Sequence, residues 1–300
     1  MQRPAKPARA MIQTPTPDRW TGTPTPAHAA FETHRFAARV VDVWELDLGK
    51  RESADDRALL TEAEQAKGDR IIIPRKATQS LRARAELRRV LGHYLGMPAG
   101  EVRFVYGEHD KPDLDPALQP SARREGPGFE LLCTLASTSS DLATATLSFN
   151  LSHSEAAGLV AVILDLRAHE LGVDVEHARC DRNLIGIAET FFAADEFAYF
   201  RRVAAAEQCP AFYRAWTRKE AYLKALGTGM SFPSNRFSIT FGRDEAPRVM
   251  RTEREGDDPS RWQLVDLPCA GDYAGAACWD GAAFPVRRYW GPTSLPTRAT

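Results

Sequence analysis

Hydrophobic and polar positions alternate, or recur at helical spacing, along most of the chain. Residues 38–48 and 145–154 alternate well enough to predict two strands. Residues 77–96 carry leucine and alanine near helical spacing and end at Gly96, which predicts a long helix with a glycine stop. Between these segments, the pattern indicates a short helix at 61–70.

The second part of the chain shows a similar order of elements. The apolar runs 158–166 and 171–176 are separated only by the sequence RAHE, which is typical of an antiparallel pair of strands. A helical pattern covers roughly 193–226, with an interruption near Cys209 and Pro210. Three further strands are predicted at residues 235–242, 262–268 and 273–279.

One long stretch carries little periodicity. Residues 101–107 are predicted to form a strand, and a turn with Lys111 and Pro112 follows it. Residues 113–144 contain PSARREGPGFE and ASTSSD, so we expect a surface insertion with little packing of its own.

Short antiparallel strands flanked by helices indicate an α+β fold rather than a doubly wound parallel sheet. The segments RAELRRVLG and KEAYLKALG share a helical pattern that ends in Leu-Gly, which hints at duplication. We therefore expect a disordered, Pro/Thr-rich tail at 1–36, an N-terminal subdomain at 37–150 that includes the insertion, a C-terminal subdomain at 151–292, and a short tail at 293–300.

Composition narrows the class of protein. With 300 residues, 43% of them hydrophobic, the chain can bury a full core. The formal charge of −1 excludes a globally basic nucleic-acid binder, and no apolar run is long enough to span a membrane. The five cysteines are odd in number and scattered, so neither a disulfide framework nor a zinc ribbon is indicated. A cytoplasmic location fits best, with an organelle transit peptide in the tail as the alternative.

The sequence GVDVE contains the first candidate chemistry. Asp174 and Glu176 are two apart on a predicted strand, so their side chains share a face, while Val173 and Val175 face the core. Neighbouring carboxylates repel unless a cation compensates them, which suits a hard divalent ion such as Mg²⁺. The alternative is an ordinary solvated strand face.

The helix in FYRAWTRKEAYLKALGTGM offers a third carboxylate. Glu220 and Lys224 are four apart and share a face, whereas Lys219 points to one flank. The functional interpretation makes Glu220 an oxygen ligand and the lysines charge partners for phosphate. The alternative is a surface ion pair that contributes about 0.3–0.5 kcal/mol.

The sequence FNLSHS places Ser152 and His153 at the end of a strand. The histidine could be a structural residue, a general base or a hydrogen-bond donor that binds phosphate. A Ser-His catalytic pair is not supported, because no GxSxG elbow is present and adjacent strand residues face opposite ways. A zinc site made by His153, Asp174, Glu176 and His177 lacks the HExxH type of spacing.

Taken together and in this order, FNLSHS, GVDVE, TFFAADEF and WTRKEAYLKALGTGM resemble the 4'-phosphopantetheinyl transferase superfamily. The chain looks most like the large, surfactin-synthetase-activating type, in which two similar α+β subdomains are related by a pseudo-two-fold. The similarity covers about residues 38–290, without the insertion at 113–144. It implies a monomeric enzyme that moves phosphopantetheine from coenzyme A to a serine of an acyl or peptidyl carrier protein, with Mg²⁺, or alternatively Mn²⁺.

The resemblance also implies roles for the acidic residues. Asp174 and Glu176 would be Mg²⁺ ligands, and Glu220 would be the third ligand or the base that accepts the serine proton. Glu176 is the other candidate for the base. Lys224 would contact the phosphates nearest the reaction, as would Lys219.

Further residues match the family's coenzyme contacts. Ser152 and His153 would contact the nucleotide phosphates, Lys111 would match the lysine of a GKP turn, and Lys67 would belong to the segment that holds the 3'-phosphate. Here the turn reads DKP, with Asp110 in place of glycine.

A second departure lies before the first long helix, where relatives commonly carry a basic residue and Gln79 aligns. Arg75 or Lys76 could supply that charge instead. Two other functions remain as alternatives: an inactive module of the same fold that binds coenzyme A or a carrier protein, and a metal-dependent phosphoesterase.

Overall fold

The computed structural model describes residues 28–29, 34–107 and 109–292. The strands are β1 (His28–Ala29), β2 (Val41–Asp47), β3 (Phe104–Tyr106), β4 (Pro112–Leu114), β5 (Thr146–Ser154), β6 (Ala157–Asp165), β7 (Leu171–His177), β8 (Phe237–Ile239), β9 (Val249–Thr252), β10 (Trp262–Leu267), β11 (Tyr273–Asp280) and β12 (Val286–Trp290). The α-helices are α1 (Ala54–Ala58), α2 (Glu62–Asp69), α3 (Pro74–Leu95), α4 (Pro120–Arg123), α5 (Pro127–Leu135), α6 (Ser139–Leu142), α7 (Leu184–Phe191), α8 (Ala194–Phe200) and α9 (Ala205–Leu226).

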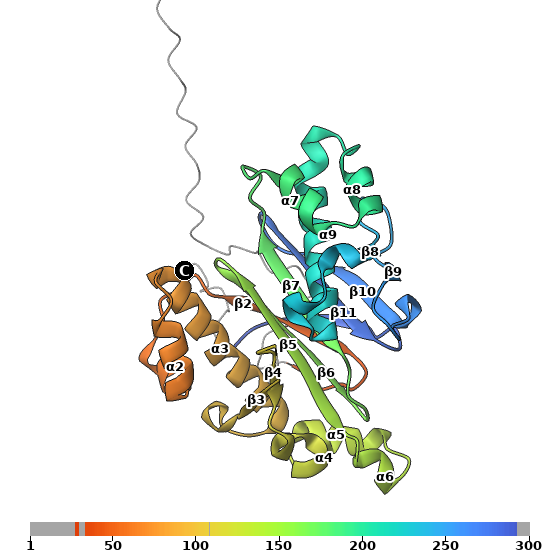
Figure 1. Ribbon diagram of the computed structural model, residues 1–300. Helices are drawn as coiled ribbons and strands as arrows, with labels where there is room; N and C mark the ends of the chain where they lie inside the picture. Colours follow the sequence, from red (N-terminus) through yellow and green to blue (C-terminus); the bar gives the residue numbers. More distant parts are fainter. Residues whose placement is uncertain (1–27, 30–33, 108, 293–300) are drawn as a thin grey trace, which may run out of the picture.

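Two sheets stand between two long helices (Figure 1). The larger sheet has the strand order β1-β12-β2-β6-β5, and the smaller has the order β10-β11-β7. Most neighbouring strands are antiparallel, but β12 pairs in parallel with both β1 and β2. The mixed content of helices and antiparallel strands confirms the predicted α+β class.

Three apolar clusters fill the spaces between these layers. Leu87 and Leu91 of α3 pack against Trp44 and the rest of one face of the larger sheet. The other face of that sheet packs on the smaller sheet, where Val173 and Val175 are fully buried. A third cluster joins the outer face of the smaller sheet to α9, α7 and α8. The layer order is therefore helix, sheet, sheet, helix.

The two sheets also meet edge to edge along β5 and β7. One edge of β7 pairs with β11, and its other edge would leave backbone N–H groups without partners. Alternate side chains of β5 accept those hydrogen bonds: Val173 N–H donates to Asn150 Oδ1 (2.9 Å), Val175 N–H to Ser152 Oγ (3.3 Å) and His177 N–H to Ser154 Oγ (3.2 Å). We call this row of hydrogen bonds the serine seam. It fixes β7 against β5 in one register.

The long helices follow the sequence prediction closely. Helix α3 ends at Gly96, which has a φ of 62°, and α9 ends at Gly227, which has a φ of 67°. Glycine adopts this left-handed conformation without steric cost. Pro210 lies inside α9 rather than at a break, and the interruption occurs at residues 201–204.

Several other expectations need correction. Strands β6 and β7 do not pair with each other, because β6 lies between β2 and β5 and β7 joins the other sheet. Residues 113–144 contain three short helices, and Leu132 among them is fully buried in the core. The boundary expected between residues 150 and 151 falls inside β5, while β12 returns to the larger sheet.

The ends of the chain were expected to be tails. Residues 1–27, 30–33 and 293–300 lie outside the described residues. His34, which falls within the expected N-terminal tail, is buried and hydrogen bonds through Nε2 to Asp42 at 3.0 Å. Among the described residues, no helix is both long and apolar enough to cross a membrane.

The cysteine pattern did not indicate a disulfide, but the structure contains one. Cys180, just after β7, is bonded to Cys209 in α9, and the two Cα atoms are 5.4 Å apart. The bond closes a loop that contains α7 and α8. Sequence spacing could not reveal this pair, because the two cysteines are 29 residues apart and meet only in the folded chain.

Candidate active site

Asp174 lies at the centre of the site, on the face of β7 that meets α9. Its side chain is 3% exposed, and its Oδ1 accepts hydrogen bonds from Lys224 Nζ (2.7 Å) and Ser152 Oγ (2.9 Å). Its Oδ2 is buried and has no hydrogen-bond partner within the described part of the chain. Gly172 allows this close approach, because a Cβ there would lie 2.0 Å from the carbonyl oxygen of Ala221.

Glu176 lies two residues further along the same face, as the sequence predicted. Its Oε2 accepts a hydrogen bond from Ser154 Oγ at 2.7 Å. Burial raises the pKa of this carboxyl group, and the nearby charge of Asp174 raises it further. The serine seam therefore orients both carboxylates of β7.

Helix α9 brings Trp216, Glu220 and Lys224 to the same place, because residues four apart share a helix face. The Glu220 carboxylate has no hydrogen bond or ion pair among the described residues, although its side chain is half-buried. Burial, and then the charge of Asp174, raises the pKa of Glu220 to about 7. A carboxylate of this kind can take a cation or a proton.

Three adjoining cavities surround these acids. One of about 460 Å³ is lined by Glu176, one of about 690 Å³ by Glu220, and one of about 360 Å³ by Lys67. Trp216 lines the first two, and His153 lines the first and third. Glu176 thus faces the first cavity and Glu220 the second, whereas Asp174 lines none of the three.

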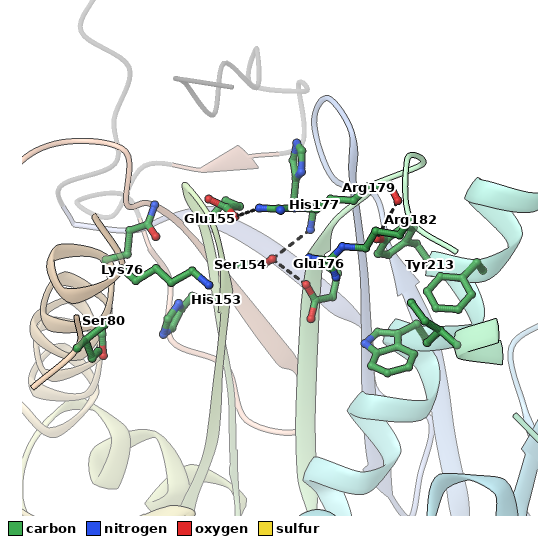
Figure 2. Close-up of a pocket in the computed structure, with 15 residues that line it drawn as sticks. Lys76, Ser80, His153, Ser154, Glu155, Glu176, His177, Arg179, Arg182 and Tyr213 are labelled. Carbon is green, nitrogen blue, oxygen red and sulfur yellow. Dashed lines mark hydrogen bonds and ion pairs between the residues drawn. The ribbon is translucent and has the colours of Figure 1, made fainter. Parts of the chain in front are cut away.

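The cavities differ in their chemistry. The walls of the 460 Å³ cavity carry the basic side chains Lys76, Arg179 and Arg182, and Figure 2 shows them around Glu176 and His153. We call it the cationic cavity. The 690 Å³ cavity is mainly apolar, with Phe191 and Phe232 in its wall. One cavity is suited to an anion and the other to an apolar chain.

The sequence matches the family model of the 4'-phosphopantetheinyl transferase superfamily over residues 170–278. The 4'-phosphopantetheinyl transferase HetI of Nostoc sp. is 33% identical over 193 residues, which cover 64% of this chain and 70% of the relative. The chain belongs to the 4'-phosphopantetheinyl transferase superfamily. This confirms the family resemblance that its motifs indicated.

Other members of the superfamily show the same relationship. A putative 4'-phosphopantetheinyl transferase of Synechocystis sp. is 27% identical over 72% of this chain and 75% of the relative. The transferase gsp of Aneurinibacillus migulanus is 29% identical over 62% of this chain and 64% of the relative. The matched family region begins just before β7 and ends within β11, so it includes all three acids.

The three acids fit a hard divalent cation in their chemistry but are not arranged as a finished metal site. All are oxygen donors, one oxygen of Asp174 lacks a partner, and the pKa of Glu220 is raised in part by the charges of both others. However, no three histidine, cysteine or acidic side chains in the described chain stand in a metal-binding group. The ammonium group of Lys224 forms an ion pair with Asp174 at 2.7 Å.

His153 projects from β5 to the border of two cavities. Its side chain is accessible to solvent there, and the surrounding protein and the charges of Lys224 and Arg84 lower its pKa below the ordinary value. The imidazole is therefore neutral at pH 7 and can donate a hydrogen bond without adding charge.

Ser152 and Lys219 do not meet their predicted roles as contacts for coenzyme phosphates. Ser152 is buried, and its Oγ is fully used by Asp174, Lys224 and the Val175 N–H group. It positions the acid and the lysine instead of facing a cavity.

Lys219 is 2% exposed and lies on the far side of α9 from the cavities. Its Nζ donates to Glu196 Oε2 (2.6 Å) and to the Phe237 carbonyl oxygen (2.9 Å). Successive helical residues point about 100° apart, so the residue next to Glu220 cannot share its face. Lys219 therefore ties α9 to α8 and β8.

In the DKP turn, aspartate occupies a backbone conformation that usually favours glycine. Asp110 has a φ of 57°, in the left-handed region that aspartate tolerates better than most residues, and its carboxylate lies 3.4 Å from Lys67 Nζ. Lys111 lines the apolar cavity, but its Nζ donates to the carbonyl oxygens of Lys224 (2.7 Å) and Leu171 (3.1 Å). Burial lowers the pKa of Lys111.

Two basic residues of the cationic cavity were not predicted from the sequence. Arg179 and Arg182 follow β7 in a loop that has no periodic pattern, and only their position shortly after GVDVE could have drawn attention to them. Lys76, one of the two candidates to replace the basic residue at position 79, does line this cavity, whereas Arg75 forms an ion pair with Glu155.

Proposed function

We propose that this protein transfers the 4'-phosphopantetheine group of coenzyme A to a serine hydroxyl of an acyl or peptidyl carrier protein. The products are the loaded carrier and 3',5'-ADP, and the metal is Mg²⁺ or Mn²⁺. One observation carries this proposal: the acids of β7 and the unpaired Glu220 of α9 meet beside a lysine, between a cationic cavity and an apolar one.

Asp174, Glu176 and Glu220 would hold the metal. Asp174 offers a buried oxygen without a partner, and Lys224 would leave Asp174 and turn toward phosphate. A bound Mg²⁺ ion would neutralise the diphosphate oxygens and so make phosphorus accessible to a nucleophile. The lysine would then balance charge on the leaving group instead of on the protein.

Glu220 is the better of the two candidates for the base. Its carboxylate has no hydrogen-bond partner among the residues that the structure describes, whereas Glu176 already accepts a hydrogen bond from Ser154. In the protein without metal, burial and the charge of Asp174 raise the pKa of Glu220 to about 7, so this carboxyl group accepts a proton more readily than an ordinary glutamate does. The serine hydroxyl gives its proton to Glu220 while its oxygen attacks the phosphorus that bears pantetheine. The bond from that phosphorus to the bridging oxygen breaks, and 3',5'-ADP leaves.

The cavities suggest how coenzyme A would lie. Lys76, Arg179, Arg182 and the neutral His153 provide hydrogen-bond donors for its phosphates. The apolar cavity, about 690 Å³ in volume, has the size and lining for the pantetheine arm. The diphosphate would then cross the acids between them.

We also propose that the chain contains two similar subdomains related by a pseudo-two-fold, and that it acts as a monomer. Helices α3 and α9 support the first point: each has 22 residues, ends at a left-handed glycine and covers the outer face of one sheet.

The decisive experiment incubates the protein with coenzyme A, Mg²⁺ and an unmodified carrier protein, then measures the intact mass of the carrier. A gain of one phosphopantetheine group supports the proposal. Binding of coenzyme A without a mass change would indicate an inactive module, and hydrolysis of coenzyme A without a carrier would indicate a phosphoesterase.

Two variants test the site itself. Glu220→Gln and Asp174→Ala should abolish transfer while the far-ultraviolet circular dichroism stays that of the wild type. Glu207→Gln changes an exposed carboxylate in the first turn of the same helix and should transfer normally. Wild-type activity in either site variant would refute the assignment.

A further inference from the structure

The cationic cavity already contains an anion that belongs to the protein. Glu155 lies in the two-residue turn between β5 and β6, directly after Ser154, and its side chain lines the cavity with Lys76 and Arg182. Figure 2 shows it reaching toward Arg179. Neither the proposed chemistry nor the metal site uses this carboxylate.

Glu155 connects a lining residue of the cavity to helix α3. One carboxylate oxygen forms an ion pair with Arg179, in the loop after β7, and the other lies 3.5 Å from an Nη atom of Arg75 in α3. The Glu155 side chain is 15% exposed, while both arginine side chains are 44% exposed. Ion pairs with such accessible arginines contribute little free energy, so a stronger anion can displace the carboxylate.

The backbone at this position is unusual. Glu155 has a φ of 49°, in the left-handed region where glycine or asparagine is the common choice for a tight hairpin. A glutamate there carries a conformational cost that glycine would not. An outlier of this kind at the edge of a binding cavity suggests that the side chain has a function.

We propose that Glu155 is a resident counter-anion that competes with the phosphate groups of the substrate for Arg179, the partner of Glu155 that lines the cavity. In the free protein it neutralises the two guanidinium groups. When a polyanionic ligand enters the cavity, its phosphate oxygens take over Arg179 and Glu155 turns away into solvent. The carboxylate thereby weakens the binding of anionic ligands, and the effect is largest for the most highly charged ones. It also favours the release of 3',5'-ADP. The inference rests on the proposed function, since it assigns ligand phosphates to this cavity.

The test is calorimetric binding of 3',5'-ADP and of 5'-AMP to the wild type and to Glu155→Gln. Glutamine keeps the size and the backbone preference of glutamate but removes the charge. Removing one negative charge several ångströms from a doubly phosphorylated ligand should tighten binding of 3',5'-ADP about fivefold to tenfold. The gain for 5'-AMP should be smaller, about twofold to threefold. The KM for coenzyme A should fall in parallel with the dissociation constant of 3',5'-ADP.

Two further variants separate charge from structure. Glu155→Gly relieves the backbone and removes the carboxylate, so it should show the same tighter binding. Glu189→Gln removes an exposed carboxylate from α7, outside the lining of the cavity, and should bind like the wild type.

The outcomes are distinct for the two proposals. Equal or weaker binding of 3',5'-ADP by both Glu155 variants would overturn the inference and leave the proposed transfer reaction intact. Equal gains for 5'-AMP and 3',5'-ADP would also overturn it, because competition between charges must scale with ligand charge. If the wild-type protein binds neither nucleotide and transfers nothing, the proposed function itself fails.

Discussion

Glu220 is expected to destabilise the metal-free protein at neutral and alkaline pH, and Glu220→Gln should remove that cost. Burial and the charge of Asp174 raise the pKa of this carboxyl group from 4.5 to about 7. Because its pKa is higher in the folded protein, the folded state binds the proton more tightly than the unfolded state does. The resulting stabilisation is fully present below pH 4.5 and is lost as pH rises through about 7.

The size of the effect follows from the two pKa values. Each unit of difference corresponds to about 1.4 kcal/mol. Between 4.5 and about 7, the wild type therefore loses up to about 3 kcal/mol that a glutamine, which does not ionise, would keep. Glu220→Gln should match the wild type near pH 4 and exceed its stability by up to about 3 kcal/mol at pH 8.5.

Urea unfolding in the presence of a chelator measures this difference across the pH range. Glu207→Gln, in the exposed first turn of α9, is the matched control and should follow the wild-type pH profile. Addition of Mg²⁺ should then stabilise the wild type more than Glu220→Gln, because a ligand that binds only the folded state raises its stability. A Glu220→Gln protein that is no more stable than the wild type at pH 8.5 would show that this carboxylate does not belong to a buried cluster of acids.

Three other substitutions probe the packing that holds the site. Lys219→Met leaves Glu196 buried without its partner and should lower the free energy of unfolding by about 3–5 kcal/mol, an effect that a lysine bound only to phosphate would not show. Gly172→Ala places a Cβ 2.0 Å from the backbone of α9, so it should lower the thermal midpoint of unfolding. It should also abolish the stabilisation that added Mg²⁺ gives the wild type. If Mg²⁺ stabilises the variant as much as the wild type, β7 and α9 need not be this close. Cys209→Ser should cost about 3–4 kcal/mol under oxidising conditions, and a reductant should erase its difference from the wild type; a difference that persists would point to packing instead of the bond to Cys180.

Local pattern was enough to predict the parts of the site but not how they are held. The period of two placed Asp174 and Glu176 on one face, and helical spacing put Glu220 and Lys224 together, because both rules depend only on neighbours along the chain. The same helical spacing predicted that Lys219 points away from the helix face that carries Glu220 and Lys224.

What the pattern could not supply were partners distant in the sequence. Nothing near β7 indicates that it pairs with β11, almost a hundred residues later, and not with β6. Glu196 belonged to a recognised motif, yet its contact with Lys219 appears only when α8 folds onto α9. Leu132 stands in a stretch rich in Gly, Pro and Ser, but tertiary packing draws it into the core.

The serine seam also limits how the molecule can move. A hinge along β5 and β7 would have to break the hydrogen bonds that Asn150, Ser152 and Ser154 accept from backbone N–H groups of β7, and the two serines also hold the carboxylates in place. Separating the two sheets would therefore break the serine seam and also release the carboxylates of Asp174 and Glu176. If the two sheets stay together, ligands enter and leave by rearrangement of turns beside the cavities, such as the turn at Glu155. Asp174 and Glu176 are consequently held as rigidly as the paired strands themselves.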